Sequence, residues 1–170
     1  MSDKQKEQKF KELLTDNKEM IYRLCYAYLY SKNEVEDLFQ EVMISIWNSI
    51  ESFRNESKVS TWVYRVVVNT ALMYNKKDKR VKSIIKNTES INRNAADDFT
   101  EYIEKEERIL KLRKAIIQLE KQDRLIISLV LEGMKYEEIS EIMGITLSNV
   151  GVKINRIKSK LFILMKEYNG

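Results

Sequence analysis

The chain has no proline, no histidine, four glycines and one cysteine among its 170 residues. Without histidine it lacks the commonest general base and the commonest metal ligand, which argues against enzymes and metal centres built on imidazole. The only cysteine, Cys25, cannot form an internal disulfide, and it shares a helical face with Ile21, Leu24 and Tyr28. We therefore expect a buried thiol rather than a nucleophile, and no cofactor.

Long apolar segments are also missing. No apolar run approaches the roughly 20 residues that span a bilayer, and residues 1–12 are charged throughout, unlike a signal peptide. We therefore expect a cytoplasmic protein. Apolar residues still make up 44% of the chain, enough for packed cores, so a disordered polymer is excluded. We also expect no enzymatic activity, because no nucleophile and base or set of metal ligands stands out.

What is present is helical periodicity. The strongest amphipathic pattern consists of Val35, Leu38, Phe39, Val42, Met43, Ile46, Trp47 and Ile50. A stripe from Phe10 to Tyr28 predicts a helix or a broken helix pair before it, and a further helix is expected from Thr61 to about Tyr74. The sequence predicts an all-α protein of two small helical domains, residues 1–82 and 105–170, joined by a flexible linker, residues 83–104.

Charge is unevenly distributed along the chain. The net charge of +4 is mild, but Phe53 to Ser83 holds eight basic and two acidic residues. The segment from Asp97 to Glu107, which is largely linker, holds six acidic residues and one lysine. Two basic regions separated by an acidic connector could contact DNA at two places.

The segment from Tyr136 to Lys160 predicts a helix-turn-helix. Gly144 lies where a tight turn needs a positive φ, and Thr146 can cap the second helix. The apolar residues recur at helical spacing as Ile139, Ile142 and Met143, then Val150, Ile154, Ile157, Leu161 and Leu164. No acidic residue occurs between Glu141 and Glu167, so the second helix is basic and suits a DNA major groove. An ordinary helical hairpin with a solvated basic face is the alternative.

Three segments together resemble the extracytoplasmic-function (group 4) sigma factors of bacterial RNA polymerase. DLFQEVMISIW, residues 37–47, is similar to the region 2.2 helix that binds the polymerase clamp. FRNESKVSTWVYRVVVNTALMY, residues 53–74, is similar to the segment that opens and reads the −10 element. DRLIISLVLEGMKYEEISEIMGI, residues 123–145, followed by NVGVKINRIKSKL, resembles region 4, which binds the −35 element.

This resemblance implies partners and site residues. The partners are core RNA polymerase, through its beta-prime clamp and beta flap, promoter DNA and an anti-sigma factor. The residues implied in binding core polymerase are Asp37, Leu38, Gln40, Glu41, Ile44 and Asn48. Those implied at the −10 element are Arg54, Asn55, Ser57, Lys58, Thr61, Trp62, Arg65, Asn69, Lys76, Lys77 and Arg80. Those implied at the −35 element are Thr146, Ser148, Asn149, Gly151, Lys153, Arg156, Lys158 and Lys160.

The expected function is therefore that of a promoter-specificity subunit that binds core polymerase and directs initiation. One alternative is a stand-alone helix-turn-helix regulator whose N-terminal domain dimerises or senses a signal. Another is an all-helical interaction protein that does not bind DNA. Gly151 departs from the family, in which this position often carries a polar or basic side chain.

Overall fold

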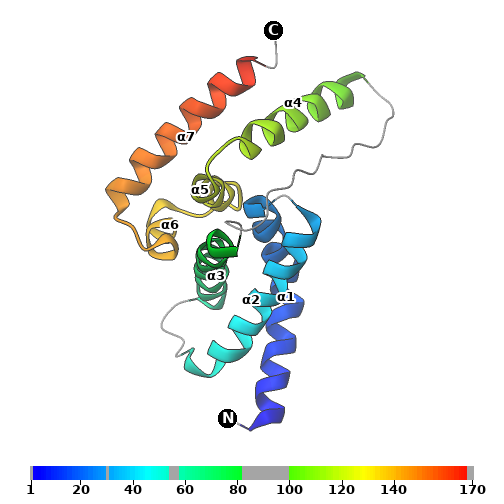
Figure 1. Ribbon diagram of the computed structural model, residues 1–170, viewed down its shortest axis with the longest axis vertical. Coiled ribbons are helices and arrows are strands. Elements are labelled where there is room, and N and C mark those ends of the chain that lie inside the picture. Colours follow the sequence, from blue (N-terminus) through cyan, green and yellow to red (C-terminus); the bar gives the residue numbers. More distant parts are fainter. Residues whose placement is uncertain (1, 30, 54–57, 82–99, 168–170) are drawn as a thin grey trace.

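The computed structural model describes residues 2–29, 31–53, 58–81 and 100–167, with side chains described outside 75–81 and 100–107. This part of the chain is helical and contains no strand, which confirms the all-α prediction (Figure 1). The helices are α1 (Asp3–Leu29), α2 (Lys32–Ser49), α3 (Val59–Val81), α4 (Thr100–Ile117), α5 (Lys121–Leu131), α6 (Tyr136–Met143) and α7 (Leu147–Glu167), with one 3₁₀ turn, η1 (Ile50–Ser52).

The N-terminal module consists of α1, α2 and α3. The helices α1 and α2 form an antiparallel pair, and α3 packs against both (Figure 1). The core is made of aliphatic side chains from all three helices, among them Ile21, Leu24, Leu38, Ile46 and Val67, all buried. The N-terminal stripe belongs to one continuous helix, and the chain leaves helical geometry only near Ser31, the extended N-cap of α2.

The third helix is longer than its apolar pattern predicted. It begins at Val59 and continues to Val81, past the expected end near Tyr74. Residues 75–80, NKKDKR, carry no apolar stripe, but they contain neither glycine nor proline and are rich in lysine and arginine, which favour helices. Of the predicted linker, residues 83–99 lie outside the described residues, and α4 begins within it at Thr100.

The C-terminal module consists of α4 to α7. Its buried side chains include Leu125, Leu129, Ile139 and Ile154, which come from three of its helices. Gly144 ends α6 in the left-handed conformation, with φ 65°, as predicted for the turn of the helix-turn-helix. The helices α4 and α7 extend together from the end of the molecule opposite the start of α1 (Figure 1).

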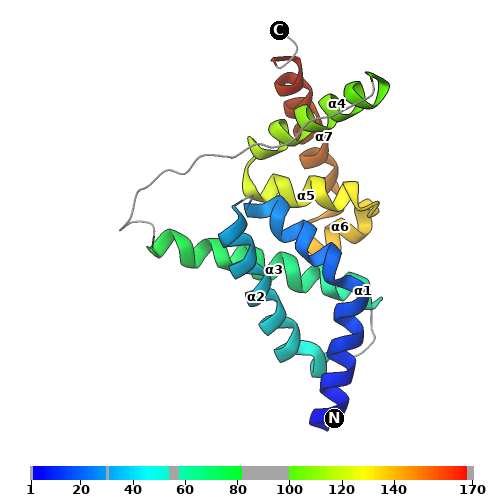
Figure 2. The same cartoon turned by 90° about the vertical axis from the view of Figure 1, so that its right-hand side faces the viewer.

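The two modules pack against each other. The helix α5 contacts α1, and α6 contacts α3 (Figure 2). Arg124 of α5 donates to the Tyr28 carbonyl of α1 at 3.1 Å and to the Ile117 carbonyl of α4 at 2.6 Å. A guanidinium at helix C-termini satisfies carbonyls that lack intrahelical partners. The N-terminal and C-terminal modules therefore contact each other directly, through α1 and α3 on one side and α5 and α6 on the other.

Cys25 is buried, as predicted from its helical face. Burial raises the pKa of its thiol to about 12, so the reactive thiolate is scarce near neutral pH. We expect iodoacetamide at pH 8 to leave the folded protein unmodified and to alkylate Cys25 fully in denaturant. Intact-mass spectrometry measures both. Rapid alkylation of the folded protein would show that the α1 core opens readily.

Candidate functional site

One face of α2 carries most of the residues that were predicted to bind core polymerase. Asp37, Glu41, Ile44 and Asn48 recur at steps of four, three and four, so they line one side of the helix. Asp37 and Asn48 are exposed, Glu41 is half-buried, and Ile44 is 56% exposed. Gln40 is also exposed beside them. An apolar side chain one turn beyond two carboxylates suits a partner surface that pairs arginine or lysine with an apolar patch.

Leu38 was predicted to bind core polymerase, and its position in the structure corrects that assignment. Its side chain is 0% exposed, and it lies within the core among buried residues of α1, α2 and α3. It belongs to the apolar stripe on the opposite side of α2 from Asp37 and Glu41, so it cannot contact a partner while the module is folded. Leu38 instead packs in the core, behind the exposed face of α2.

A second candidate surface follows α3. Lys58, Trp62, Arg65 and Asn69 recur at steps of four, three and four, and helix positions 76 and 80 continue this register. Lys58 and Asn69 are exposed, and Trp62 is half-buried, with its ring 5.1 Å from that of Phe53. The stripe combines cations, an amide and an aromatic ring, as nucleic-acid surfaces do.

Some residues predicted for this surface are buried or lie outside the described residues and side chains. Thr61 is buried, which corrects its assignment as a DNA contact, because its register places it toward the core. Arg54, Asn55 and Ser57 lie outside the described residues. Lys76, Lys77 and Arg80 lie on α3, but their side chains are outside the description.

The third candidate surface is the N-terminal half of α7. The Thr146 hydroxyl accepts the Asn149 backbone N–H at 3.3 Å, which confirms the predicted cap. The buried stripe of Val150, Ile154 and Ile157 anchors α7 in its module. The polar candidates lie off this stripe: Ser148, Asn149, Arg156, Lys158 and Lys160 are exposed, and Gly151 and Lys153 are half-buried.

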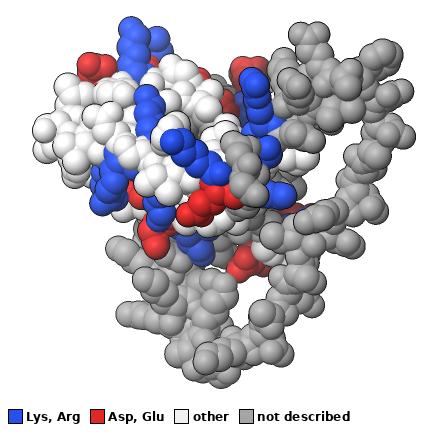
Figure 3. Space-filling view, turned by 90° about the horizontal axis from the view of Figure 1, so that it is seen from above, with Lys and Arg blue, Asp and Glu red and all other residues white. Residues whose placement is uncertain are grey.

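The charges of α7 are partly neutralised from within the module. Asp123, in the first turn of α5, has a side chain only 9% exposed, and its carboxylate lies 3.4 Å from Arg156 and 3.8 Å from Lys153. The sequence analysis missed this pairing because the partners are far apart along the chain. Figure 3 shows basic side chains dispersed over one face of the molecule, with acidic side chains among them. The Asp123 carboxylate, 3.4 Å away, thus orients the Arg156 side chain from within the module.

Glycine has opposite roles at two positions of the helix-turn-helix. At Gly151, an added Cβ would meet no atom within 4 Å, whereas Gly144 has φ +65°. We expect Gly151→Ala to raise the free energy of unfolding by about 0.5–1 kcal/mol and Gly144→Ala to lower it by about 1 kcal/mol. Thermal denaturation followed by circular dichroism measures both. Equal shifts would contradict the helical and left-handed assignments.

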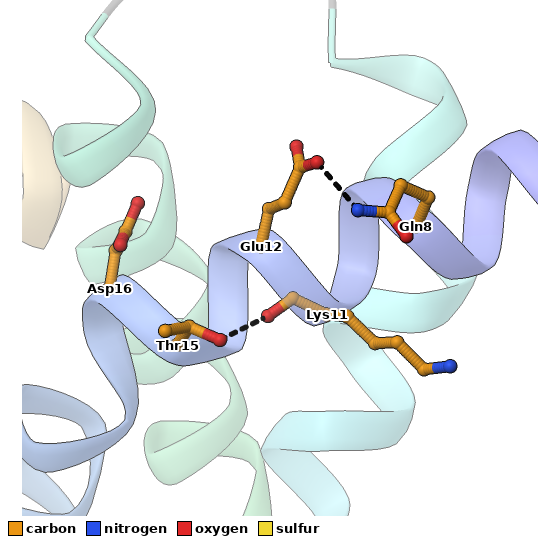
Figure 4. Close-up of a pocket in the computed structure, with 5 residues that line it drawn as sticks. All are labelled: Gln8, Lys11, Glu12, Thr15 and Asp16. Carbon is orange, nitrogen blue, oxygen red and sulfur yellow. Dashed lines mark hydrogen bonds between the residues drawn. The ribbon is translucent and has the colours of Figure 1, made fainter.

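Among the described residues, other surface features add no candidate site. A shallow hollow on α1 is lined by Gln8, Lys11, Glu12, Thr15 and Asp16, all from a single helix (Figure 4). Gln8 donates to Glu12 at 2.8 Å and Thr15 to the Lys11 carbonyl at 2.9 Å, so the polar groups are engaged locally. Within the described ranges, no acidic and cysteine side chains cluster as metal ligands would, and none of the helices is long and apolar enough to cross a membrane.

Comparison with known proteins identifies both modules. Residues 13–81 match the family Sigma-70 region 2, and residues 109–161 match Sigma-70, region 4. The chain is 28% identical over 155 residues to RNA polymerase sigma factor SigV of Bacillus subtilis, covering 90% of this chain and 84% of SigV. It is 32% identical over 142 residues to the ECF RNA polymerase sigma-E factor of Haemophilus influenzae, covering 77% of this chain and 74% of that protein.

Solved structures share the fold. The sigma factor RpoE, crystallised with the anti-sigma factor NepR from Bartonella quintana, superposes with a TM-score of 0.74 at 19% identity, covering 94% of this chain and 98% of RpoE. CnrH, in complex with the cytosolic domain of CnrY, superposes with a TM-score of 0.65 at 15% identity, covering 95% and 90%. With a region 2 module, a region 4 module and relatives that align across both, the chain belongs to the extracytoplasmic-function sigma factors of RNA polymerase.

Proposed function

We propose that this sigma factor divides promoter recognition between its two modules. The N-terminal module, proposed as residues 1–82, binds core polymerase and captures the melted −10 element, and the C-terminal module, proposed as residues 105–170, binds the −35 element. The observation that carries this division is the joint occurrence of an exposed α2 face and a capped helix-turn-helix in one chain. Each surface has the chemistry that its assigned partner requires.

For core polymerase, the proposed contact is the α2 face of Asp37, Gln40, Glu41, Ile44 and Asn48. Carboxylates one turn apart accept hydrogen bonds from arginine with defined geometry, and Ile44 adds apolar area at the centre. The beta-prime clamp is the proposed partner of this face, and the beta flap that of the C-terminal module.

For the −10 element, the proposed contact is the α3 stripe with the loop before it. A base drawn out of the duplex exposes a pairing edge for polar side chains and a face for stacking. Lys58, Arg65 and Asn69 supply donors on one register of the stripe, and Trp62 supplies a ring. The proposed surface also includes six residues that are assigned from the sequence alone, at positions 54, 55, 57, 76, 77 and 80.

For the −35 element, the proposed contact is the start of α7 in the major groove. Ser148 and Asn149 lie at the helix N-terminus, where backbone N–H groups also attract phosphate. Arg156, Lys158 and Lys160 continue along the exposed side and suit base edges or phosphates. Lys153 lies half-buried beside Asp123 and adds a further positive charge to the N-terminal half of α7.

The remaining parts of the proposal follow from the family. The solved relative RpoE was crystallised with the anti-sigma factor NepR, and we propose that a protein of this kind also restrains this chain. The chain itself catalyses no reaction in this proposal, and it acts in the cytoplasm with polymerase. A stand-alone regulator is not favoured, since the N-terminal half matches Sigma-70 region 2.

The proposal is tested by reconstituted transcription. Core polymerase is incubated with this protein and a library of promoter templates, and the transcripts are sequenced. We expect initiation at a subset of templates that share two separated elements, and none from these sites with core polymerase alone. Equal initiation with and without the protein on every template would contradict the proposed function.

A further inference from the structure

An apolar side chain occupies the exposed side of α7. Val152 is 65% exposed, although it lies in the N-terminal half of the helix, which carries the proposed −35 contacts. Single exposed apolar residues are common on protein surfaces and need no function. The register of Val152 on the helix and the side chains around it distinguish it from such residues.

Val152 lies between two residues that were predicted to contact the −35 element. Ser148, Val152 and Arg156 follow one another at steps of four, so they lie on one side of α7, about a turn apart, and all three are exposed. The buried stripe of α7 faces the opposite way, and the helix runs along the outer edge of the C-terminal module (Figure 1). A partner that reaches both Ser148 and Arg156 must therefore also contact Val152.

The residues next to Val152 in the chain leave its side chain uncovered. Gly151 has no side chain, and an added Cβ there would meet no atom within 4 Å. The Lys153 side chain is only 20% exposed, and its ammonium lies 3.8 Å from the Asp123 carboxylate. The two methyl groups of Val152 therefore form the surface at this point of the helix.

Among the base edges of a DNA major groove, only that of thymine carries an apolar group. Its C5-methyl group projects into the groove, whereas the other edges present hydrogen-bond donors and acceptors. Valine has no polar side-chain atom, so it would remove those polar groups from water without replacing their hydrogen bonds. Contact with the thymine methyl instead removes apolar surface of both partners from water. A valine at this place thus favours thymine over the other bases.

The charge around Val152 favours DNA over an apolar protein partner. No acidic residue occurs between Glu141 and Glu167, whereas Arg156, Lys158 and Lys160 are exposed on α7. Such a surface attracts the phosphates that border both sides of a major groove. A polyanion that offers an apolar group between its phosphates matches this combination of cations and valine.

We propose that Val152 is a specificity-determining residue of this sigma factor and contacts the C5-methyl group of a thymine in the −35 element. This inference rests on the proposed function, because it assumes that the start of α7 lies in the major groove. Ser148 and Arg156 then contact the DNA on either side of this thymine. The sequence analysis missed Val152 because it searched α7 for polar and basic side chains.

The test removes the two sets of methyl groups separately and together. The DNA is a promoter fragment identified by reconstituted transcription, in which deoxyuridine replaces each thymine of the −35 element in turn, on either strand. Deoxyuridine keeps the base pair and lacks only the methyl group. The proteins are wild type, Val152→Ala and the control Ile163→Ala, each bound to core polymerase, and competition binding measures the dissociation constants.

Ile163 is a matched control because it resembles Val152 in all but position along α7. It is apolar, 58% exposed and eleven residues farther on, which returns it to the same side of the helix about 16.5 Å along the axis at 1.5 Å per residue. Neither alanine variant removes a buried side chain, and alanine favours helices, so both proteins should fold.

We expect one thymine whose replacement by deoxyuridine weakens binding of the wild-type complex about three- to fivefold, as loss of one buried methyl group implies. Val152→Ala should bind the unmodified promoter less tightly by a similar factor and should no longer respond to deoxyuridine at that position. Ile163→Ala should match wild type on every fragment.

Three outcomes would overturn the methyl contact: a wild-type complex insensitive to deoxyuridine at every position, an equal response of wild type and Val152→Ala at every position, or a response that Ile163→Ala loses as well. A failure of the proposed function would look different. Scrambling the whole −35 element would then leave the affinity of the wild-type complex unchanged, and both proposals would fall together.

Discussion

Replacing Asp37 and Glu41 together with alanine is expected to weaken binding to core RNA polymerase by about 10- to 100-fold. Each carboxylate stands to lose a charge-assisted hydrogen bond, which is worth about 1.5–3 kcal/mol. The expected loss of affinity is smaller than the sum of two such bonds because water partly solvates both carboxylates. Neither residue lies in the core of α2, so the melting temperature should change little. Titration of fluorescently labelled protein with core polymerase measures the dissociation constant.

The matched control for this double variant lies on α1. Glu12 and Asp16 are also exposed acids one turn apart, but they lie outside the proposed polymerase face. Replacing both with alanine removes the same net charge and should leave polymerase affinity unchanged. Equal weakening by both double variants would show that polymerase responds to overall charge, and unchanged binding of the first would contradict the α2 assignment.

Arg156→Ala is expected to reduce initiation at promoters that need a −35 element by about 10- to 100-fold, the effect of losing one good contact to a base or phosphate. Lys153 remains beside Asp123, so the buried carboxylate keeps one cation. The protein should fold, with a modest loss of thermal stability that circular dichroism measures. Transcription from templates with intact and scrambled upstream elements separates loss of recognition from general weakening.

The matched control for Arg156 is Lys166→Ala. Lys166 is exposed on the same helix, in its last turn, about 15 Å farther along the axis at 1.5 Å per residue. It should leave initiation unchanged at every template. An Arg156→Ala protein as active as wild type on all templates would exclude this arginine from the promoter contact.

Local pattern predicted the helices well. The stripe from Val35 to Ile50 and the turn at Gly144 depend on neighbours a few residues away, and these determine amphipathic helices and left-handed turns. The cap at Thr146 was likewise readable from sequence. The same reasoning failed for α3 beyond Tyr74, where charged residues extend the helix without an apolar stripe to mark it.

Contacts between distant residues could not be read this way. Arg23 donates to Glu132 at 2.7 Å, yet the two are 109 positions apart and nothing in their local patterns links them. The pairing of Asp123 with Arg156 is hidden for the same reason, since an acid in a helix's first turn is as well explained by the helix dipole. The candidate surfaces were therefore predictable, whereas the internal acids that engage their cations were not.

Under the proposed role of α7, the position of Asp123 bears on how strongly DNA of any sequence would be bound. Any duplex that recruits Arg156 would compete with the Asp123 carboxylate, which lies 3.4 Å from it and would then keep only Lys153, at 3.8 Å. The net gain from a lone phosphate is small, because one anion merely replaces another. Only a site that also supplies matched base edges would offset that exchange, so under the proposed role of α7 a single internal acid would keep phosphate contacts alone from holding the protein on DNA.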